Sequence, residues 1–169
     1  MLDPRFEAAL RSGQGVVVIA AGSNSDKAHI ERLSTELSKY EISHTVHICS
    51  AHKQCNELME LIAAYNEFTE PLVYIGVAGG TDALSGVLSY HAFAPVISCP
   101  PDAPNETCLT NPKGSSNATV FHPGNAARFA AQILAQSNPS FRKKLADGIT
   151  TKNQSLQEAN KEWTPRLFD

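Results

Sequence analysis

The sequence predicts an α/β fold, a three-layer sandwich in which helices cover both faces of a central parallel sheet. Short apolar runs of strand length alternate along the chain with segments of helical periodicity, which is the pattern of consecutive βαβ units. Several of these runs are apolar at every position, as expected of parallel strands that are buried on both faces. The chain has 169 residues, 42% of them hydrophobic, which suffices for one domain with one core. Together these features predict a flavodoxin-like or Rossmann-like architecture.

The first strand is expected at residues 16–20, where every side chain is apolar and most are β-branched. A short turn follows, and Asp26 then opens a helix. Ile30, Leu33 and Leu37 are spaced three and four residues apart, so they form one apolar face of that helix. This first strand, turn and helix make up the first half of a βαβ unit.

The second strand is expected at residues 44–49, where polar and apolar side chains alternate. Alternation indicates a strand with one solvated face, so we place it nearer an edge of the sheet. Later segments repeat the same two patterns, apolar runs and amphipathic stripes. The remaining strands are expected at 72–77, 95–99 and 118–121, and the remaining helices at 54–66, 82–90 and 125–136.

Residues 102–117 differ from the rest of the chain, because they are rich in Pro, Asn, Ser and Thr and almost lack large apolar side chains. This composition predicts an irregular loop. A loop of this length within a small domain is more often functional than idle.

The chain beyond residue 137 keeps helical propensity but becomes polar. We therefore divide the chain into an α/β catalytic domain at residues 1–137 and a C-terminal helical extension at 138–169. Since the extension has few large apolar side chains, we expect it to pack on a neighbouring subunit rather than on its own core. These side chains are Phe141, Leu145, Ile149, Leu156 and Trp163.

Composition and charge exclude several classes of function. The net charge is −3 and the isoelectric point is near 6.1, which argues against a nucleic-acid-binding surface. The N-terminal segment is interrupted by charged residues and lacks the apolar stretch of a signal peptide, and the run at 16–21 is too short to span a bilayer. We therefore expect a cytoplasmic protein with neither a nucleic acid nor a membrane as partner.

The cysteines do not predict a metal site or a disulfide framework. The chain contains four of them and no Cys-x-x-Cys pair, and a domain of this size has a core without cross-links. Cys49 and His52 are a closely spaced pair of potential zinc ligands, but no Cys-x-x-Cys pair accompanies them to complete a tetrahedral site. Cys49 and Cys99 each end a predicted buried strand, so we interpret them as small apolar residues.

Three turns follow predicted parallel strands and carry polar or glycine-rich sequence. They read GSNSD at 22–26, SAHK at 50–53 and AGGT at 78–81. In open α/β sheets, ligands bind outside the carboxyl ends of the strands. The three turns are therefore expected to open onto the same edge of the sheet, where their convergence predicts a binding site.

The first turn is suited to an anion. Gly22 allows close backbone approach, Ser23 and Ser25 offer hydroxyl donors, and the helix that follows presents free N–H groups. Asp26 would repel a phosphate, but its carboxylate is able to accept hydrogen bonds from sugar hydroxyls. The alternative is that Ser25 or Asp26 only caps the helix, a common arrangement.

The second turn carries the stronger signal. Among the six histidines, His52 alone follows a strand end within a loop of small residues. Histidine is the usual proton carrier near neutral pH. Lys53 adds positive charge for an anionic substrate or a developing carboxylate. The alternative is a surface or capping histidine without a catalytic role.

The third turn allows a ligand ring to lie against the backbone of Ala78, Gly79 and Gly80. The alternative is a tight strand-to-helix connection, which also favours glycine. The chain contains neither a Walker A sequence nor GxGxxG, so nucleoside triphosphates and dinucleotides lose their usual support as ligands.

In order and in spacing, these three turns resemble the three signature motifs of the phosphoribosylaminoimidazole carboxylase and mutase family. The resemblance extends over residues 16–134 and is most specific for the pair GSxSD and SAHK. It implies a three-layer α/β sandwich assembled as a homo-octamer, with sites at subunit junctions. It also implies carboxylation of 5-aminoimidazole ribonucleotide by CO2 in purine biosynthesis, a reversible reaction that uses no ATP, biotin, metal or other cofactor.

The resemblance also implies the roles of individual residues. Ser23, Ser25 and Asp26, together with Gly22, would bind the ribose phosphate portion of the substrate. Ser50 and Ala51 would lie beside it.

His52 would accept the proton from C4 of the imidazole ring as the carboxylate arrives. Lys53 and the backbone of Gly79 and Gly80 would stabilise the new carboxylate or position CO2.

The family contains direct carboxylases and N5-carboxyaminoimidazole ribonucleotide mutases. Mutases usually carry Arg after the histidine and His soon after the Gly-Gly pair, whereas this chain has Lys53 and Ala83. The sequence is therefore more similar to the direct-carboxylase type, class II. Two departures accompany this similarity: residues 80–82 read GTD where Arg-Ser-Asn is common, and the loop after Pro101 is shorter than usual. The alternatives are a mutase and a non-catalytic nucleotide-binding paralogue, the latter suggested by the short loop.

Overall fold

Five parallel strands form the central sheet of the computed structural model, which describes residues 3–163. Their spatial order is β2-β1-β3-β4-β5, and each neighbouring pair is parallel. The order places β2 at an edge, as its alternating pattern predicts. The strands are β1 (Val16–Ala21), β2 (Ser43–Ile48), β3 (Leu72–Val77), β4 (Val96–Ser98) and β5 (Ala118–Thr119).

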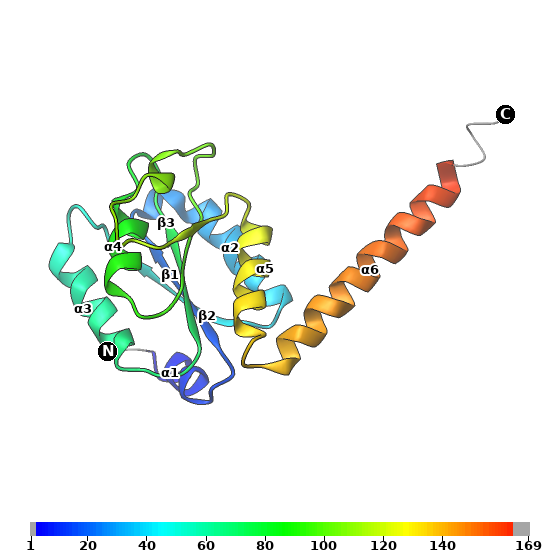
Figure 1. The fold of residues 1–169 in the computed structure, drawn as a ribbon, viewed down its shortest axis with the longest axis horizontal. Helices are drawn as coiled ribbons and strands as arrows, with labels where there is room; N and C mark the ends of the chain where they lie inside the picture. Colours follow the sequence, from blue (N-terminus) through cyan, green and yellow to red (C-terminus); the bar gives the residue numbers. More distant parts are fainter. Residues whose placement is uncertain (1–2, 164–169) are drawn as a thin grey trace.

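Helices cover both faces of the sheet (Figure 1), with α2 and α5 on one face and α1, α3 and α4 on the other. Successive residues of β1 point to opposite faces, Val17 toward α2 and α5 and Val18 toward α3 and α4. This arrangement confirms the predicted three-layer α/β sandwich. The helices are α1 (Pro4–Arg11), α2 (Lys27–Lys39), α3 (Cys55–Asn66), α4 (Ala83–His91), α5 (Pro123–Leu134) and α6 (Pro139–Trp163).

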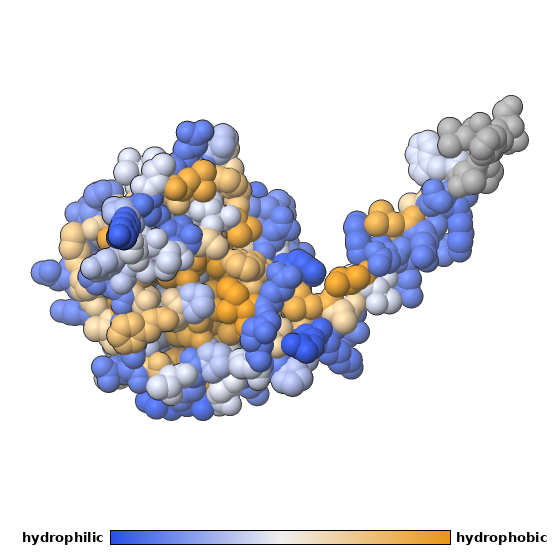
Figure 2. All heavy atoms as spheres, viewed as in Figure 1, coloured by the Kyte–Doolittle hydropathy of each residue, from blue (hydrophilic) through white to orange (hydrophobic). Residues whose placement is uncertain are grey.

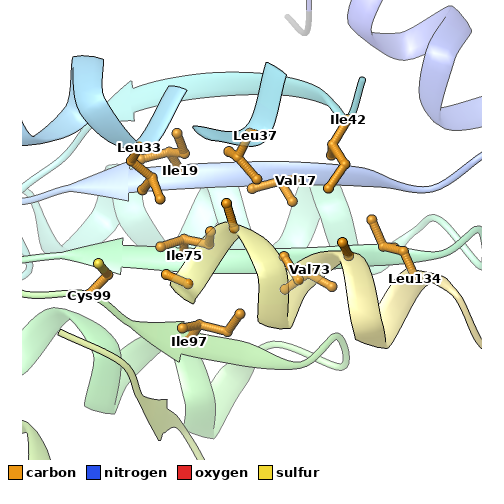
Figure 3. Close-up of a cluster of buried hydrophobic side chains, with 14 of the residues drawn as sticks. Val17, Ile19, Leu33, Leu37, Ile42, Val73, Ile75, Ile97, Cys99 and Leu134 are labelled. Atoms are coloured by element: carbon orange, nitrogen blue, oxygen red, sulfur yellow. The ribbon is translucent and has the colours of Figure 1, made fainter. Parts of the chain in front are cut away.

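The core beneath α2 and α5 fixes where the first turn lies (Figure 3). Leu33 and Leu37, from the predicted apolar face of α2, are completely buried against Ile19 and its neighbours in β1 and β3. Ile30 also belongs to this cluster. Because both ends of the connection are held by packed apolar side chains, the turn between β1 and α2 has little freedom.

The helix α1 was not anticipated from the sequence. The Asp3 carboxylate caps it, accepting hydrogen bonds from the N–H groups of Arg5 at 2.9 Å and Phe6 at 3.1 Å, and Pro4 occupies the first helical position. Phe6 and Leu10 are buried on the face covered by α3. Eight residues with two buried positions give too short a pattern for helical periodicity to be recognised.

Two further elements differ in length from the prediction. The helix α5 begins at Pro123 rather than at 125, because His122 caps it: the Nδ1 atom accepts a hydrogen bond from the Gly124 N–H at 3.1 Å. The strand β5 covers only residues 118 and 119 of the predicted 118–121. Within the predicted 102–117 loop, residues 107–109 form a single turn of 3-10 helix.

The helix α6 projects away from the domain (Figure 1). Phe141 is buried in the core beneath α2 and α5, and Leu145 packs against the same cluster, so the beginning of α6 belongs to the domain. Residues 146–163 are exposed. Figure 2 shows apolar side chains along this otherwise hydrophilic helix, and Ile149 and Leu156 are 49% and 55% exposed. No helix within the described part of the chain is long and apolar enough to cross a membrane.

Candidate active site

The three polar turns surround one pocket at the carboxyl edge of the sheet. Because β2, β1 and β3 are neighbours, the turns that follow them lie side by side. The pocket has a volume of about 270 Å³. Its lining residues are Gly22, Ser23, Ser25, Asp26, Ser50, Ala51, His52, Lys53, Ala78, Gly79, Thr81, Ala83 and Leu84.

The first turn contains a single turn of 3-10 helix, Asn24–Asp26, ahead of α2. Its cap is Ser23, whose hydroxyl oxygen accepts hydrogen bonds from the Ser25 N–H at 3.1 Å and the Ser25 hydroxyl at 2.8 Å. Asp26 is the N-cap residue of α2, yet its carboxylate makes no capping hydrogen bond. The alternative that Asp26 serves as a helix cap is therefore not observed, and its carboxylate lines the pocket.

The second turn is closed by its own backbone. The carbonyl of Ser50 accepts hydrogen bonds from the N–H groups of Lys53 at 3.2 Å and Gln54 at 2.8 Å. The N–H of Cys49, at the start of the turn, donates to the Ala21 carbonyl at 2.8 Å and so fixes the turn against the end of β1. Burial raises the pKa of the Cys49 thiol, which stays uncharged beneath the turn.

His52 and Lys53 are exposed at the tip of this turn and line the pocket. Within residues 3–163, neither side chain forms a hydrogen bond or ion pair with another residue. The N-cap residue of α3 is Gln54, so His52 does not cap that helix. Both side chains therefore remain available to a ligand.

The other histidines each have a structural contact instead, and none of them lines this pocket. Burial lowers the pKa of His29, which favours its neutral form. The contacts are those of His29 with the Cys99 carbonyl, His44 with Ser34 and the Ile42 carbonyl, His47 with the Tyr65 hydroxyl, His91 with the Tyr90 ring, and His122 with the Gly124 N–H.

Gly80 is the one predicted site residue that does not line the pocket. Its backbone has φ of +66° and faces the 102–107 loop. The N–H of Gly80 donates to the Asp102 carboxylate at 2.7 Å, and its carbonyl accepts from the Asn105 amide at 3.0 Å. The neighbouring loop thus occupies both backbone groups of Gly80, and a contact between Gly80 and the ligand stays a prediction.

Three lining residues had been given no contact with the substrate, namely Thr81, Ala83 and Leu84. Thr81 ends the third turn, and Ala83 and Leu84 begin α4, whose amino end faces the same edge of the sheet. Their position in the sequence, shortly after the Gly-Gly pair, indicates that they border the site, because residues that lead into a helix at this edge of the sheet lie next to it.

The pocket combines groups that suit a small polar molecule. Serine hydroxyls and backbone groups offer hydrogen bonds, Lys53 carries a positive charge, and Asp26 carries a carboxylate. His52 brings an imidazole, the side chain that most often transfers protons in enzymes. Across residues 3–163, no three His, Cys, Asp or Glu side chains are grouped so that they would hold a metal ion.

Comparison with known proteins places this geometry in a family. The sequence profile of AIR carboxylase matches residues 16–155, which include all three turns. A phosphoribosylaminoimidazole carboxylase of Treponema denticola is 32% identical over 151 residues, covering 86% of this chain and 90% of that protein.

The human bifunctional phosphoribosylaminoimidazole carboxylase/phosphoribosylaminoimidazole succinocarboxamide synthetase is 35% identical over 164 residues. The match covers 93% of this chain but only 39% of the human protein, so the chain spans about two-fifths of that relative. The crystal structure of Treponema denticola PurE superposes with a TM-score of 0.83 at 28% identity, covering 89% of this chain and 99% of that one. The chain belongs to the AIR carboxylase family.

Proposed function

We propose that this protein carboxylates 5-aminoimidazole ribonucleotide with CO2 at C4 of the imidazole ring, as a cytoplasmic enzyme of purine biosynthesis. The relatives named as carboxylases support the reaction, including the Treponema denticola protein, which the match covers over 90% of its length. The observation that carries the proposal is that His52 and Lys53, which have no side-chain partner within residues 3–163, line the same pocket as the serine-rich first turn.

The first turn holds the ribose phosphate end of the substrate in this proposal. The hydroxyls of Ser23 and Ser25 and the backbone at Gly22 meet the phosphate, while the Asp26 carboxylate accepts hydrogen bonds from ribose hydroxyls. Ser50 and Ala51 border the same end. The imidazole ring then lies between the second and third turns, beside Ala78 and Gly79.

The proposed chemistry needs a single proton acceptor. The aminoimidazole ring is an enamine-like nucleophile, and its C4 forms a carbon–carbon bond to the carbon of CO2. The neutral imidazole of His52 then accepts the proton from C4, and the loss of this proton restores the aromatic ring of the substrate. His52 afterwards passes the proton to solvent. The Lys53 ammonium lies beside His52 and stabilises the carboxylate as its charge develops.

Lys53 and Ala83 both line the pocket and favour the direct carboxylase over the mutase. The two reactions are separated by supplying purified protein with 5-aminoimidazole ribonucleotide and bicarbonate without ATP. We expect the C4-carboxylated product to form. Turnover of the N5-carboxylated substrate alone would identify a mutase, and the absence of both reactions would identify a non-catalytic paralogue.

The exposed part of α6 supports a second element of the proposal, assembly into an octamer. Ile149 and Leu156 are seven residues apart and therefore lie on one face of α6, where each is about half exposed. We propose that residues 146–163 pack on a neighbouring subunit. The same expectation was wrong for Phe141 and Leu145, which pack on the core of their own domain.

Introducing Asp at both Ile149 and Leu156 is expected to dissociate the assembly, because it places two charges in an apolar contact. Light scattering measures the change in mass. The matched control carries Asp at Thr151 and Gln154, exposed positions away from that face of α6, and should keep the mass of the wild type. Equal masses for both variants would contradict a role of this face in assembly.

A further inference from the structure

The short loop after Pro101 is hydrogen-bonded to the third turn. Asp102 Oδ2 accepts the Gly80 N–H at 2.7 Å, while Asn105 Nδ2 donates both to the Gly80 carbonyl and to Asp102 Oδ1, each at 3.0 Å. The Thr107 hydroxyl lies 3.0 Å from the Gly80 carbonyl and 2.5 Å from Asn105 Oδ1, the two acceptors for its one proton, and it accepts the Asp82 N–H at 3.0 Å. We call Asp102, Asn105 and Thr107 the clasp.

The clasp is also connected within itself and packed against the turn. The Thr107 N–H donates to Asn105 Oδ1 at 3.0 Å, and Asn105 is only 5% exposed. A Cβ atom built on Gly79 would lie 3.4 Å from the Asp102 carboxylate, so the carboxylate lies directly against the backbone that lines the pocket. The residues on the two sides are more than 20 positions apart in sequence.

We propose that Asp102, Asn105 and Thr107 are positioning residues, which hold the backbone of the third turn in the shape that forms one wall of the ligand pocket. The proposal rests on the proposed function for its kinetic consequences. It also assigns a role to the short loop. The two departures from the family pattern, residues 80–82 and the loop after Pro101, are in direct contact with each other.

The charge of Asp102 strengthens this arrangement. A hydrogen bond from a backbone N–H to an ionised carboxylate is shorter and stronger than one between neutral groups. The hydrogen bond from Gly80 holds the pKa of Asp102 below its usual value, so the carboxylate is ionised throughout the neutral range. Gly80 has a positive φ, and glycine adopts positive and negative φ about equally. The hydrogen bonds from the loop therefore hold this residue in the conformation that the turn needs.

Replacing Asp102 with Ala tests the proposal. We expect KM for the ribonucleotide to rise about tenfold, since the wall loses a charge-assisted hydrogen bond, with kcat changed less than about threefold. The pH profile of kcat should stay as in the wild type, because the proton acceptor is on another turn. D102N is expected to be intermediate, because its amide oxygen still accepts the Gly80 N–H while its NH2 group faces the Asn105 amide.

Glu106→Ala is the matched control, because Glu106 is exposed in the same loop and its side chain makes no capping hydrogen bond. Its KM should equal that of the wild type. Amide hydrogen exchange of the ligand-free protein gives a readout independent of activity. Exchange at Gly80 should accelerate in D102A, exchange at Asp82 should accelerate in T107V, and neither should change in E106A.

The outcomes separate the clasp from the proposed reaction. If KM and amide exchange in D102A match those of E106A, the positioning role is wrong. If D102A loses activity only in proportion to a loss of folded protein, with KM unchanged, the clasp merely stabilises the fold and the proposal is also overturned. If the wild type does not carboxylate the ribonucleotide, the proposed function fails, while the exchange rates still decide whether the clasp holds the turn.

Discussion

His52→Asn is expected to lower kcat/KM for carboxylation by about 10²- to 10⁴-fold, the usual contribution of a positioned proton acceptor. Asparagine keeps a polar side chain of similar reach at the tip of the second turn but does not take up a proton at neutral pH. The turn should keep its shape, because its closing hydrogen bonds run between the backbone of Ser50 and the backbone of Lys53 and Gln54. Steady-state kinetics with the ribonucleotide and bicarbonate measures the effect.

His91→Asn provides the control. His91 is an exposed histidine at the end of α4, in contact with the Tyr90 ring and outside the pocket. We expect the control to retain wild-type activity, and both variants to bind the ribonucleotide, because the serine-rich first turn is intact in each. Full activity in H52N would show that another group accepts the C4 proton, and the proposed mechanism would then be wrong.

The sequence predicted the fold and the convergence of the three turns on one pocket because both depend on local patterns. Apolar runs such as 72–77 indicate buried parallel strands, and the carboxyl ends of parallel strands lie at one edge of the sheet. The three turns then had to be near one another once β2, β1 and β3 were neighbours. The position of Gln54 as the α3 N-cap residue excludes a capping role for His52 at that helix, while its catalytic role stays a prediction.

The environment of the third turn was not predictable in the same way. Gly80 faces the loop because Asp102 and Asn105 bind both of its backbone groups, contacts that join residues more than 20 positions apart. Side-chain hydrogen bonds of this kind leave no periodic signal in the sequence. The loop was recognised by its composition, but composition does not indicate which of its polar residues reach the turn.

Asp82→Ala is expected to reduce the free energy of unfolding by about 3 kcal/mol, because it leaves buried hydrogen-bond donors without an acceptor. Asp82 is only 4% exposed at the start of α4. Its carboxylate accepts hydrogen bonds from the Ser85 N–H at 2.9 Å, from the Ser98 hydroxyl at 2.7 Å and from the Ser85 hydroxyl. Ser85 and Ser98 are completely buried, so water does not replace the lost acceptor. Urea denaturation measures the change, and the melting temperature should fall by about 10 °C.

Asp82→Asn separates the hydrogen bonds from the charge. Its amide oxygen is able to accept the Ser85 N–H, and its NH2 group is able to donate to the hydroxyls of Ser85 and Ser98, which rotate to become acceptors. Removing a buried charge also relieves a desolvation cost, so we expect a loss below about 1 kcal/mol. Equal losses in D82A and D82N would instead assign the stability to the charge. Because Asp82 joins β4 to the start of α4, directly after the third turn, the hydrogen bonds that stabilise the fold there also limit how far the wall of the pocket is able to move.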